Sequence, residues 1–346
     1  MGTNCAIIPI GGGTSVSNAL QCPEKEKRAA GIIEQSLERQ LNAKVYTCGH
    51  EPDSIEFSSL GGWVSARASG MKKNKWGTFY SLIVPRMSSG PDLHHIIMGS
   101  EGTLGVVTEV TIKIFPLPEV KRYGSLVLPD FAHGVAFFRE VARQRIQPAS
   151  LRLVDNEQFI MGQALKLEVN SYCAALKSSL SRLYITKWKG FHIDEMCAAT
   201  CVFEGSLDEV NNEERRLYAL AEEYNGVFGG EENGKYGYRL TFAIAYLRVL
   251  SLCQNVKTLI KRLAKNLRVQ YPVLASCRVT QVYDAGACVY FYFGFNTRGL
   301  HNGLEVYDKI ETAARDEIIA CGGSISHHHG IGKLRKQCNN SKDRLS

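Results

Sequence analysis

The stretch Ile7-Ile8-Pro9-Ile10-Gly11-Gly12-Gly13-Thr14-Ser15-Val16 is an apolar run that ends in three glycines and two hydroxyl residues. Glycine has no Cβ and accepts positive φ angles, so consecutive backbone N–H groups can turn toward one point and bind an anion. Such a turn can hold a pyrophosphate, with Thr14 and Ser15 at its rim. It has neither the lysine of a P-loop nor the G-x-G-x-x-G of a Rossmann turn, which disfavours both of those nucleotide sites. A plain glycine-rich loop after a strand is the alternative.

The composition indicates a soluble, globular chain with two domains. Its 346 residues are 45% hydrophobic and 22% charged. No apolar run approaches the ~18 residues that a membrane span needs. The net charge of +7 comes from scattered lysines and arginines without a zinc-finger or RNP pattern. The charge therefore favours a phosphorylated small molecule or an anionic lipid surface over nucleic acid, and any membrane contact is expected to be peripheral.

The spacing of cysteine and histidine argues against disulfides and metal. The 11 cysteines are irregularly spaced and include no C-x-x-C pair, so reduced, mostly buried thiols of an intracellular protein are expected. In an extended segment His327 and His329 project to one side and His328 to the other. No acid or cysteine lies at a spacing that completes a ligand set, so we expect no metal. The imidazoles are suited to shuttling protons or binding a phosphate.

Two further stretches of the first half, residues 49–70 and 98–105, are rich in small side chains. They suit a backbone that is pressed against a flat group, with a flexible loop as the alternative. The second stretch runs into residues 106–114, in which Val110, Ile112 and Ile114 alternate with Thr111 and Lys113, and this alternation predicts a half-buried strand. Apolar residues at helical spacing predict a helix over 29–42.

After Pro116 and Pro118, which are expected to end the first domain, strand-like and helix-like segments alternate. This alternation predicts a second domain of the α+β class. The expected strands are 124–128, 150–154, 199–204 and 289–293, and the expected helices are 131–144 with Asp130 as N-cap, 208–224, and 305–320.

Polar residues on two of these strands allow a structural and a chemical interpretation. Arg152 is flanked by Leu151 and Leu153, and the pattern alone predicts an outward-facing residue on a half-buried strand. Tyr290 and Tyr292 share one strand face. A buried tyrosine more often binds a hydrogen-bond partner than acts as an acid or base.

The first half resembles the FAD-binding domain of vanillyl-alcohol-oxidase-type (PCMH-type) flavoproteins. The similar segments are PIGGGTSV at 9–16, DSIEFSSLGGWVSARASG at 53–70 and GSEGTLGVVTEVTIKI at 99–114. The resemblance implies FAD, with its pyrophosphate on the first segment and the rest of the dinucleotide on the others. Covalent members carry a histidine just after the glycines, so Thr14 and Ser15 imply non-covalent FAD. The cofactor-binding residues implied are Pro9, Ile10, Gly11, Gly12, Gly13, Thr14, Ser15, Asp53, Ser54, Ile55, Glu56, Phe57, Ser58, Ser59, Ala66, Arg67, Ala68, Ser69, Glu101, Gly102, Thr103, Leu104, Gly105, Val106 and Val107.

Further motifs narrow the resemblance to the alkyldihydroxyacetonephosphate synthase (alkylglycerone-phosphate synthase) family. They run from about Ile8 to Gln337 and are GHEPDS, GGWVSARASGMKKN, HHIIMGSEGTLGVVTE, PASLRLVDN, FEG, SCRVTQ, YDAGACVYFYF and SHHHGIGKLRK. The resemblance implies a peroxisomal flavoenzyme of ether-lipid (plasmalogen) synthesis. Such an enzyme exchanges the acyl chain of acyl-dihydroxyacetone phosphate for a long-chain fatty alcohol, through an adduct at flavin N5 without net redox change.

The same resemblance implies residue roles and partners. Tyr290 matches the family's acid/base tyrosine, Arg152 an arginine needed for activity, and His327, His328 and His329 the active-site histidine run. A proton must leave the carbon next to a carbonyl, and a tyrosine near imidazoles can accept and return it. Peripheral membrane contact and a homodimer are also implied. The peroxisomal location rests on the resemblance, because the first residues show no secretory or transit pattern.

The chain departs from the family pattern by omission. A targeting region and a helical segment before the glycine loop are expected to be missing, and two strand-bearing segments, between Cys22 and Gly31 and around 76–85, to be shortened. Residues 245–251 lack the family's insertion with the arginine that grips the substrate phosphate. We therefore expect a largely complete FAD site and an incomplete substrate site. The predicted domains are an FAD-binding domain over 1–117, a cap domain over 118–337 and a divergent tail over 338–346.

Two other functions stay open. An FAD-dependent 2-hydroxy-acid dehydrogenase on the same scaffold would reduce its flavin with D-lactate or glycolate. A non-catalytic flavin-binding relative, or a partner of the full-length enzyme, would bind flavin without catalysing exchange.

Overall fold

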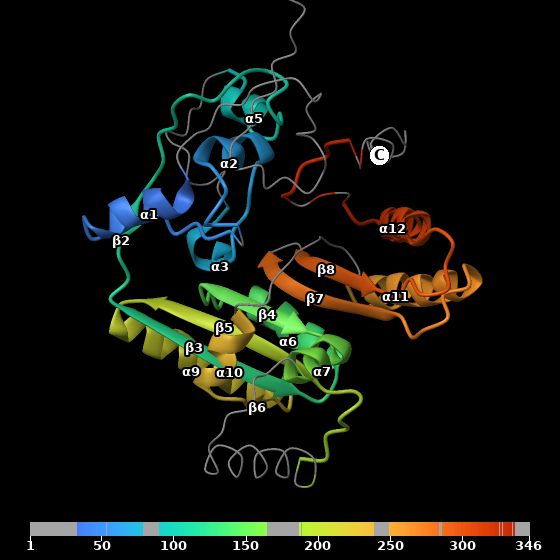
Figure 1. The fold of residues 1–346 in the computed structure, drawn as a ribbon. Helices are drawn as coiled ribbons and strands as arrows, with labels where there is room; N and C mark the ends of the chain where they lie inside the picture. Colours follow the sequence, from blue (N-terminus) through green and yellow to red (C-terminus); the bar gives the residue numbers. More distant parts are fainter. Residues whose placement is uncertain are drawn as a thin grey trace, which may run out of the picture. The chain divides into compact units, whose positions relative to one another are not determined.

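The computed structural model forms two compact units (Figure 1). It describes residues 33–52, 54–78, 90–164, 187, 189–238, 249–283, 286–324, 326, 328–333 and 335. Unit 1 consists of Met1–Pro118 with Ile325–Ser346, and unit 2 consists of Glu119–Ser324. The predicted division placed 325–337 in the second domain, whereas the described residues of this range, 326, 328–333 and 335, belong to unit 1. No helix in the described ranges has the length and apolar character needed to cross a bilayer.

Unit 2 is built on a six-stranded sheet with the order β6-β3-β5-β4-β7-β8. Every neighbouring pair in it is antiparallel. The pairing of β4 with β7 joins Leu153 to Val279 and Val154 to Arg278. The strands are β3 (Val120–Leu128), β4 (Ser150–Val154), β5 (Cys197–Gly205), β6 (Val227–Phe228), β7 (Leu274–Tyr283) and β8 (Gly286–Gly294).

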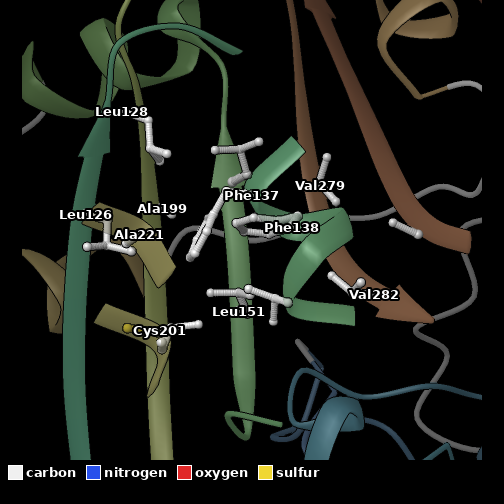
Figure 2. Packing of buried hydrophobic residues seen from close by; sticks show 14 of the residues in the cluster. Leu126, Leu128, Phe137, Phe138, Leu151, Ala199, Cys201, Ala221, Val279 and Val282 are labelled. Atoms are coloured by element: carbon white, nitrogen blue, oxygen red, sulfur yellow. The ribbon is translucent and has the colours of Figure 1, made fainter. Parts of the chain in front are cut away.

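Helices cover the sheet face onto which Leu151 of β4 projects (Figure 2). Phe137 and Phe138 of α6 and Leu217 of α9 pack there against the strands. Helices α11 and α12 pack together against β7 and β8 and bury a second cluster (Figure 1). Each buried aliphatic or aromatic side chain contributes about 1.5–3 kcal/mol, so these clusters supply most of the driving force for folding. The helices described in unit 2 are α6 (Phe131–Arg143), α7 (Asn156–Ala164), α9 (Leu207–Glu223), α10 (Glu231–Tyr238), α11 (Val249–Asn266) and α12 (Gly303–Ala320).

Local capping chemistry sets the starts of three of these helices. Asp130 Oδ1 accepts a hydrogen bond from the N–H of His133 at 2.8 Å, so the predicted N-cap of α6 is confirmed. Ser206 and Glu209 form a reciprocal capping box at the start of α9. Asn302 caps α12, where its Oδ1 accepts a hydrogen bond from the N–H of Glu305 at 3.2 Å. Each cap satisfies an N–H that no helical carbonyl can reach and contributes about 1 kcal/mol.

Unit 1 is organised around Trp63 of α2. Trp63 and Val64 pack with Ala68 and Met98, and Leu37 of α1 lies against them. Strands β1 and β2 form a short antiparallel pair. The elements described in this unit are α1 (Glu34–Asn42), β1 (Tyr46–Thr47), α2 (Leu60–Ala66), α3 (Lys73–Trp76), α5 (Leu93–Ile97) and β2 (Phe115–Pro116).

The elements predicted for the second half are confirmed to within a few residues. The strand over 150–154 coincides with β4, the other three strands lie inside β3, β5 and β8, and the three helices correspond to α6, α9 and α12. The helix predicted over 29–42 is α1 from Glu34 onward, and 29–32 lie outside the described residues.

The strand predicted over 106–114 is wrong. These residues form no strand in the described chain, apart from a single bridge at Ile112. Val107, Val110 and Ile112 are partly buried against the Trp63 cluster. Ile114 is 40% exposed, so the apolar residues of the alternating pattern do not all pack on this cluster. Alternation alone does not make a strand, because a ladder also requires hydrogen bonds to a neighbouring strand.

The described cysteines are free thiols, and Cys48, Cys197, Cys201, Cys253, Cys277 and Cys288 are buried. Burial raises the pKa of Cys201 to about 12, so this thiol stays protonated and unreactive at neutral pH.

Gly234 of α10 and Gly162 of α7 provide a matched test of packing. A Cβ at Gly234 would lie 2.6 Å from the carbonyl oxygen of Gly124 in β3, whereas nothing lies within 4 Å of a Cβ at Gly162. We expect Gly234→Ala to destabilise the chain by about 1–3 kcal/mol, because α10 must move away from the sheet. Gly162→Ala should instead stabilise it by up to about 1 kcal/mol through helix propensity. Urea denaturation followed by circular dichroism measures both, and equal effects would contradict the close contact.

Candidate active site

One face of β4, β7 and β8 carries polar side chains, and we name it the polar sheet face. Arg152 shares a face of β4 with Val154, which lies opposite Arg278 on β7. Arg278 lies opposite Tyr290 on β8. Because strand residues alternate, their apolar neighbours project into the helix-covered core. The polar sheet face consists of Ser150, Arg152, Ser276, Arg278, Tyr290 and Tyr292.

A β-bulge keeps the two faces separate along the β7–β8 ladder. Val279 lies opposite Val289, but Gln281 lies opposite Cys288, so Thr280 is an extra residue on β7. The bulge places Gln281 on the polar side and Val282 in the core cluster. Without the extra residue, the remainder of β7 would present its side chains to the wrong faces.

Arg152 is buried on the polar sheet face, with 1% of its surface exposed. It pairs with Thr200 of β5, while Leu151 and Leu153 lie in the core on the other face. The prediction of a residue facing solvent is therefore wrong: the side chain points away from the core, yet that side of the strand is buried too. Burying a guanidinium is costly unless other groups stabilise its charge, which makes Arg152 a candidate for function.

Arg278 lies between the two tyrosines, and the sequence motifs predicted no role for it. It is 1% exposed, and its Nη2 donates a hydrogen bond to Tyr292 Oη at 2.6 Å. The guanidinium carbon lies 5.8 Å from the ring centroid of Tyr290 and 5.5 Å from that of Tyr292. Cation–π attraction operates at these distances. The available sequence signal was Cys277-Arg278-Val279, which repeats the apolar–arginine–apolar pattern around Arg152.

Two serine hydroxyls add hydrogen-bonding capacity to the polar sheet face. The Oγ atoms of Ser150 and Ser276 are buried, and neither has a hydrogen-bond partner within the described residues. A buried hydroxyl without a partner costs about 1–3 kcal/mol. These serines lie on the same face as the arginines and can donate to a polar ligand.

Asp155, which directly follows β4, fixes the junction with β7. Its N–H donates to the carbonyl of Cys277 at 3.1 Å, and its Oδ2 accepts from the N–H of Cys277 at 2.9 Å. Lys257 of α11 forms an ion pair with the same carboxylate. Glu157 accepts from the N–H of Ala275 at 3.2 Å. These bonds hold the register between β4 and β7, and with it the relative positions of Arg152 and Arg278.

The described residues assigned to FAD lie on three segments of unit 1. Residues 54–57 form a turn before α2, 66–69 lie at its end, and 101–107 follow α5. The hydroxyls of Ser58 and Ser59 already serve α2: Trp63 Nε1 donates to Ser58 Oγ at 3.1 Å, and the N–H of Gly62 donates to Ser59 Oγ at 3.2 Å. The predicted cofactor residues 9–15 and Asp53, and the predicted catalytic residue His327, lie outside the described residues.

Part of the small-residue pattern serves protein packing. A Cβ at Gly49 would lie 2.5 Å from the indole Cγ of Trp76. The flat group against which this glycine is pressed is therefore a tryptophan of the same unit.

The carboxylate of Glu101 binds the loop that carries the histidines. The N–H groups of Ile331 and Gly332 donate to Glu101 Oε1 and Oε2, the second at 2.9 Å. The N–H of Glu101 itself donates to the carbonyl of Ser65 in α2 at 2.9 Å. Gly330 has a φ of +78°, and a Cβ there would lie 2.6 Å from the Glu101 carboxylate, so only glycine fits. The cofactor role of Glu101 stays a prediction, while its side chain serves the histidine loop.

The described part of the histidine run is held by local hydrogen bonds. The rings of His328 and His329 lie edge to face, with their centroids 4.3 Å apart. The N–H of His329 donates to Ser326 Oγ at 3.2 Å, and Arg335 Nη1 donates to the carbonyl of Gly330 at 2.8 Å. The structure thus brings these histidines together with Glu101 in unit 1, while Arg152 and Tyr290 lie together in unit 2.

Residues 102–106 fit a flat cofactor. Leu104 is 60% and Val106 is 61% exposed, and no atom lies within 4 Å of a Cβ at Gly105. Exposed apolar side chains beside an unobstructed backbone form a surface on which an aromatic ring system can pack. The apolar surface of this segment is compatible with the flat ring system of FAD.

Comparisons with known proteins agree with the motifs. Residues 117–243 and 232–344 match the C-terminal domain of FAD linked oxidases, and residues 24–85 match an FAD binding domain. The alkyldihydroxyacetonephosphate synthase of Caenorhabditis elegans is 64% identical over 400 residues, covering 97% of this chain and 67% of the relative. That of Dictyostelium discoideum is 26% identical, covering 95% and 63%. A solved alkyldihydroxyacetonephosphate synthase structure has a TM-score of 0.76 at 22% identity, covering 92% of this chain and 67% of that one.

The chain belongs to the alkyldihydroxyacetonephosphate synthase family of FAD linked oxidases. The predicted resemblance, the α+β fold class and FAD as the cofactor of the family are confirmed. This chain spans about two thirds of the length of these relatives. Because the alignment with the 64% identical relative runs over 400 residues and this chain has 346, dozens of aligned positions have no counterpart here. The gaps are consistent with the expected internal shortening.

His50 provides a test of how unit 1 responds to acid. Its ring lies 4.5 Å from that of Trp63, and burial lowers the pKa of His50 from 6.5 to about 3. The unfolded chain therefore binds this proton first, and stability falls as the pH drops from 6.5 toward 3, at most by ~1.4 kcal/mol per pH unit. We expect His50→Phe to flatten this dependence in urea unfolding followed by tryptophan fluorescence. The exposed His301→Phe is the control, and an unchanged slope in His50→Phe would contradict the prediction.

Glu101→Gln should loosen the histidine loop. The amide retains one oxygen and presents its NH₂ group to a backbone donor, so one charge-assisted hydrogen bond of about 1.5–3 kcal/mol is lost. We expect hydrogen exchange of the Ile331 and Gly332 amides to accelerate at least about tenfold, with more tryptic cleavage after Lys333. The exposed Glu109→Gln in the same unit should change neither. Unaltered protection in Glu101→Gln would show that the carboxylate does not hold the loop.

Proposed function

We propose that the chain is an FAD-dependent alkylglycerone-phosphate synthase that exchanges the acyl chain of acyl-dihydroxyacetone phosphate for a long-chain fatty alcohol. The 64% identity to the Caenorhabditis elegans alkyldihydroxyacetonephosphate synthase supports this assignment. A role in ether-lipid (plasmalogen) synthesis, a peroxisomal location, peripheral membrane contact and a homodimer belong to the same proposal.

The observation that carries the proposal is the burial of Tyr290 on a face with two arginines. Tyr290 is 5% exposed, lies across the strand pair from Arg278, and shares its sheet face with Arg152. Removing a proton from a carbon next to a carbonyl needs a base whose anionic form is stabilised, and nearby cations favour phenolate over phenol. Tyr290 is therefore the proposed group that accepts and returns this proton.

Arg152 would stabilise negative charge on the substrate. Loss of the proton places negative charge on the adjacent carbonyl oxygen, and the departing acyl group leaves as a carboxylate. A buried guanidinium acts on such charges with little competition from water. The hydroxyls of Ser150 and Ser276 would add neutral donors on the same face.

Unit 1 would supply the cofactor and the imidazoles. Residues 102–106, with the other predicted cofactor residues, would hold FAD without a covalent bond, and FAD when bound supplies an electron-poor ring that takes up and returns electron density. Glu101 would keep His328 and His329 in place through the backbone of their loop. Imidazoles can pass protons or bind a phosphate near neutral pH.

The function is tested on the purified full chain. Its visible spectrum reports bound flavin, and exchange of labelled fatty alcohol into acyl-dihydroxyacetone phosphate reports the reaction; both together support the proposal. Flavin reduction by D-lactate or glycolate without exchange would indicate a 2-hydroxy-acid dehydrogenase instead. Bound flavin without either activity would indicate the non-catalytic relative, and a well-folded chain that takes up no FAD would contradict all three.

Tyr290→Phe should lower the exchange rate at least about 100-fold, because the proton acceptor is lost. Flavin content should not change, since the residues proposed to bind FAD lie in unit 1. Tyr307→Phe is the matched control: Tyr307 belongs to α12 and stacks on Phe293 at 4.8 Å, outside the polar sheet face. Exchange that persists in Tyr290→Phe would remove this residue from the mechanism.

A further inference from the structure

We propose that Arg278 is a positioning residue that stabilises the phenolate form of Tyr290, and that Tyr292 holds Arg278 in place for this task. The catalytic consequence rests on the proposed function. The ionisation itself is a property of unit 2 and can be measured without any activity.

The guanidinium of Arg278 is placed symmetrically over both rings. Its carbon lies 5.8 Å from the centroid of Tyr290 and 5.5 Å from that of Tyr292, and the two centroids are 6.1 Å apart. The hydrogen bond from Nη2 to Tyr292 Oη fixes one edge of the planar group at 2.6 Å. An arginine anchored by one phenol oxygen therefore keeps its charge beside the neighbouring tyrosine.

Sheet geometry makes this arrangement rigid. Arg278 and Tyr290 are direct partners across the β7–β8 ladder, and Ser276 and Tyr292 form the next pair on the same face. Direct cross-strand partners have Cβ atoms about 4.5–5.5 Å apart, so the two side chains start from adjacent positions as long as the ladder holds. The bulge at Thr280 lies beyond both pairs and leaves their register intact.

The groups that face Tyr290 in unit 2 come from three strands. Arg278 and Tyr283 face it from β7, Cys288 and Tyr292 lie next to it on the same face of β8, and Arg152 lies on this sheet face one strand further away, on β4. Helices α11 and α12 contact the opposite face, through Phe291 and Phe293. At neutral pH the charged members of this set are the two arginines, and Arg278 is the one directly paired with Tyr290.

A cation about 6 Å away in a partly desolvated site lowers the ionisation midpoint of a phenol by roughly one to two pH units relative to the same site without the cation. A purely structural role for Arg278, filling space between two rings, would give no such shift. The midpoint of Tyr290 therefore distinguishes the two roles.

The test is a difference titration of tyrosinate ultraviolet absorbance. Subtracting the curve of Tyr290→Phe from that of the unaltered chain isolates Tyr290 among the 15 tyrosines. The same subtraction is made in the Arg278→Met background: the curve of the double variant Arg278→Met/Tyr290→Phe is subtracted from that of Arg278→Met. We expect the Tyr290 midpoint to rise by one to two pH units in Arg278→Met, and by a smaller amount in Tyr292→Phe, where the charge remains but its anchor is lost.

Arg298→Met, which removes an exposed arginine of the same unit, is the control and should leave the midpoint unchanged. An unshifted midpoint in folded Arg278→Met would overturn the proposal. If that variant does not fold, Arg278→Lys and Arg278→Gln replace it. Only lysine keeps the charge, so the glutamine variant must have the higher midpoint, and equal midpoints would also overturn the proposal.

The exchange assay separates this inference from the proposed function. If both hold, the alkaline shift of Tyr290 in Arg278→Met is accompanied by the same shift in the pH profile of exchange, and activity returns at higher pH. A shifted Tyr290 midpoint in a chain that catalyses no exchange would refute the proposed function and leave the role of Arg278 intact.

Discussion

The pairing of β4 with β7 is the constraint on which the candidate active site depends. This pairing joins two parts of the sheet: β3-β5-β4, which packs on α6 and α9, and β7-β8, which packs on α11 and α12. Its facing pairs are Leu153 with Val279 and Val154 with Arg278. Asp155 reinforces the junction through two backbone hydrogen bonds with Cys277. If the register of β4 or β7 slipped by one residue, the side chain of Arg152 or Arg278 would point into an apolar cluster, where burying its charge is costly. The core therefore selects the register that builds the polar sheet face.

This arrangement places two positive charges on one buried face, which does not stabilise the fold by itself. Desolvation of each guanidinium is unfavourable, and two like charges on adjacent strands repel. The aromatic rings of Tyr290 and Tyr292 and the hydrogen bond to Tyr292 offset part of this cost. The apolar clusters on the other face supply the remaining stability. A polar face that the core must support is typical of a site retained for chemistry rather than for stability.

Local sequence patterns predicted the strands and helices of unit 2 better than the site. Alternation around Arg152 was enough to predict β4, because both neighbours are core leucines; it could not show that the opposite face is buried too. The alternation around Arg278 is intact, since the bulge at Thr280 comes after it, but this pattern could not show that its sheet face is buried either. In unit 1, the alternation over 110–114 predicted a strand, but the described residues there form no ladder apart from a single bridge at Ile112. Glu101 acts on residues 230 positions away, which no local pattern can reveal.

The polar sheet face can persist in a chain that lacks dozens of positions present in its 64% identical relative. The residues that form it come from three strands, and antiparallel register is fixed by facing pairs rather than by the length of chain between them. The entropic contribution to the free energy of closing a connection changes by only about 0.6 kcal/mol when the length of the connection doubles. Shortening between strands is therefore cheap, whereas one residue inserted or lost inside β4, β7 or β8 would reverse the faces. Selection for chemistry should thus act on the strands and tolerate change in their connections.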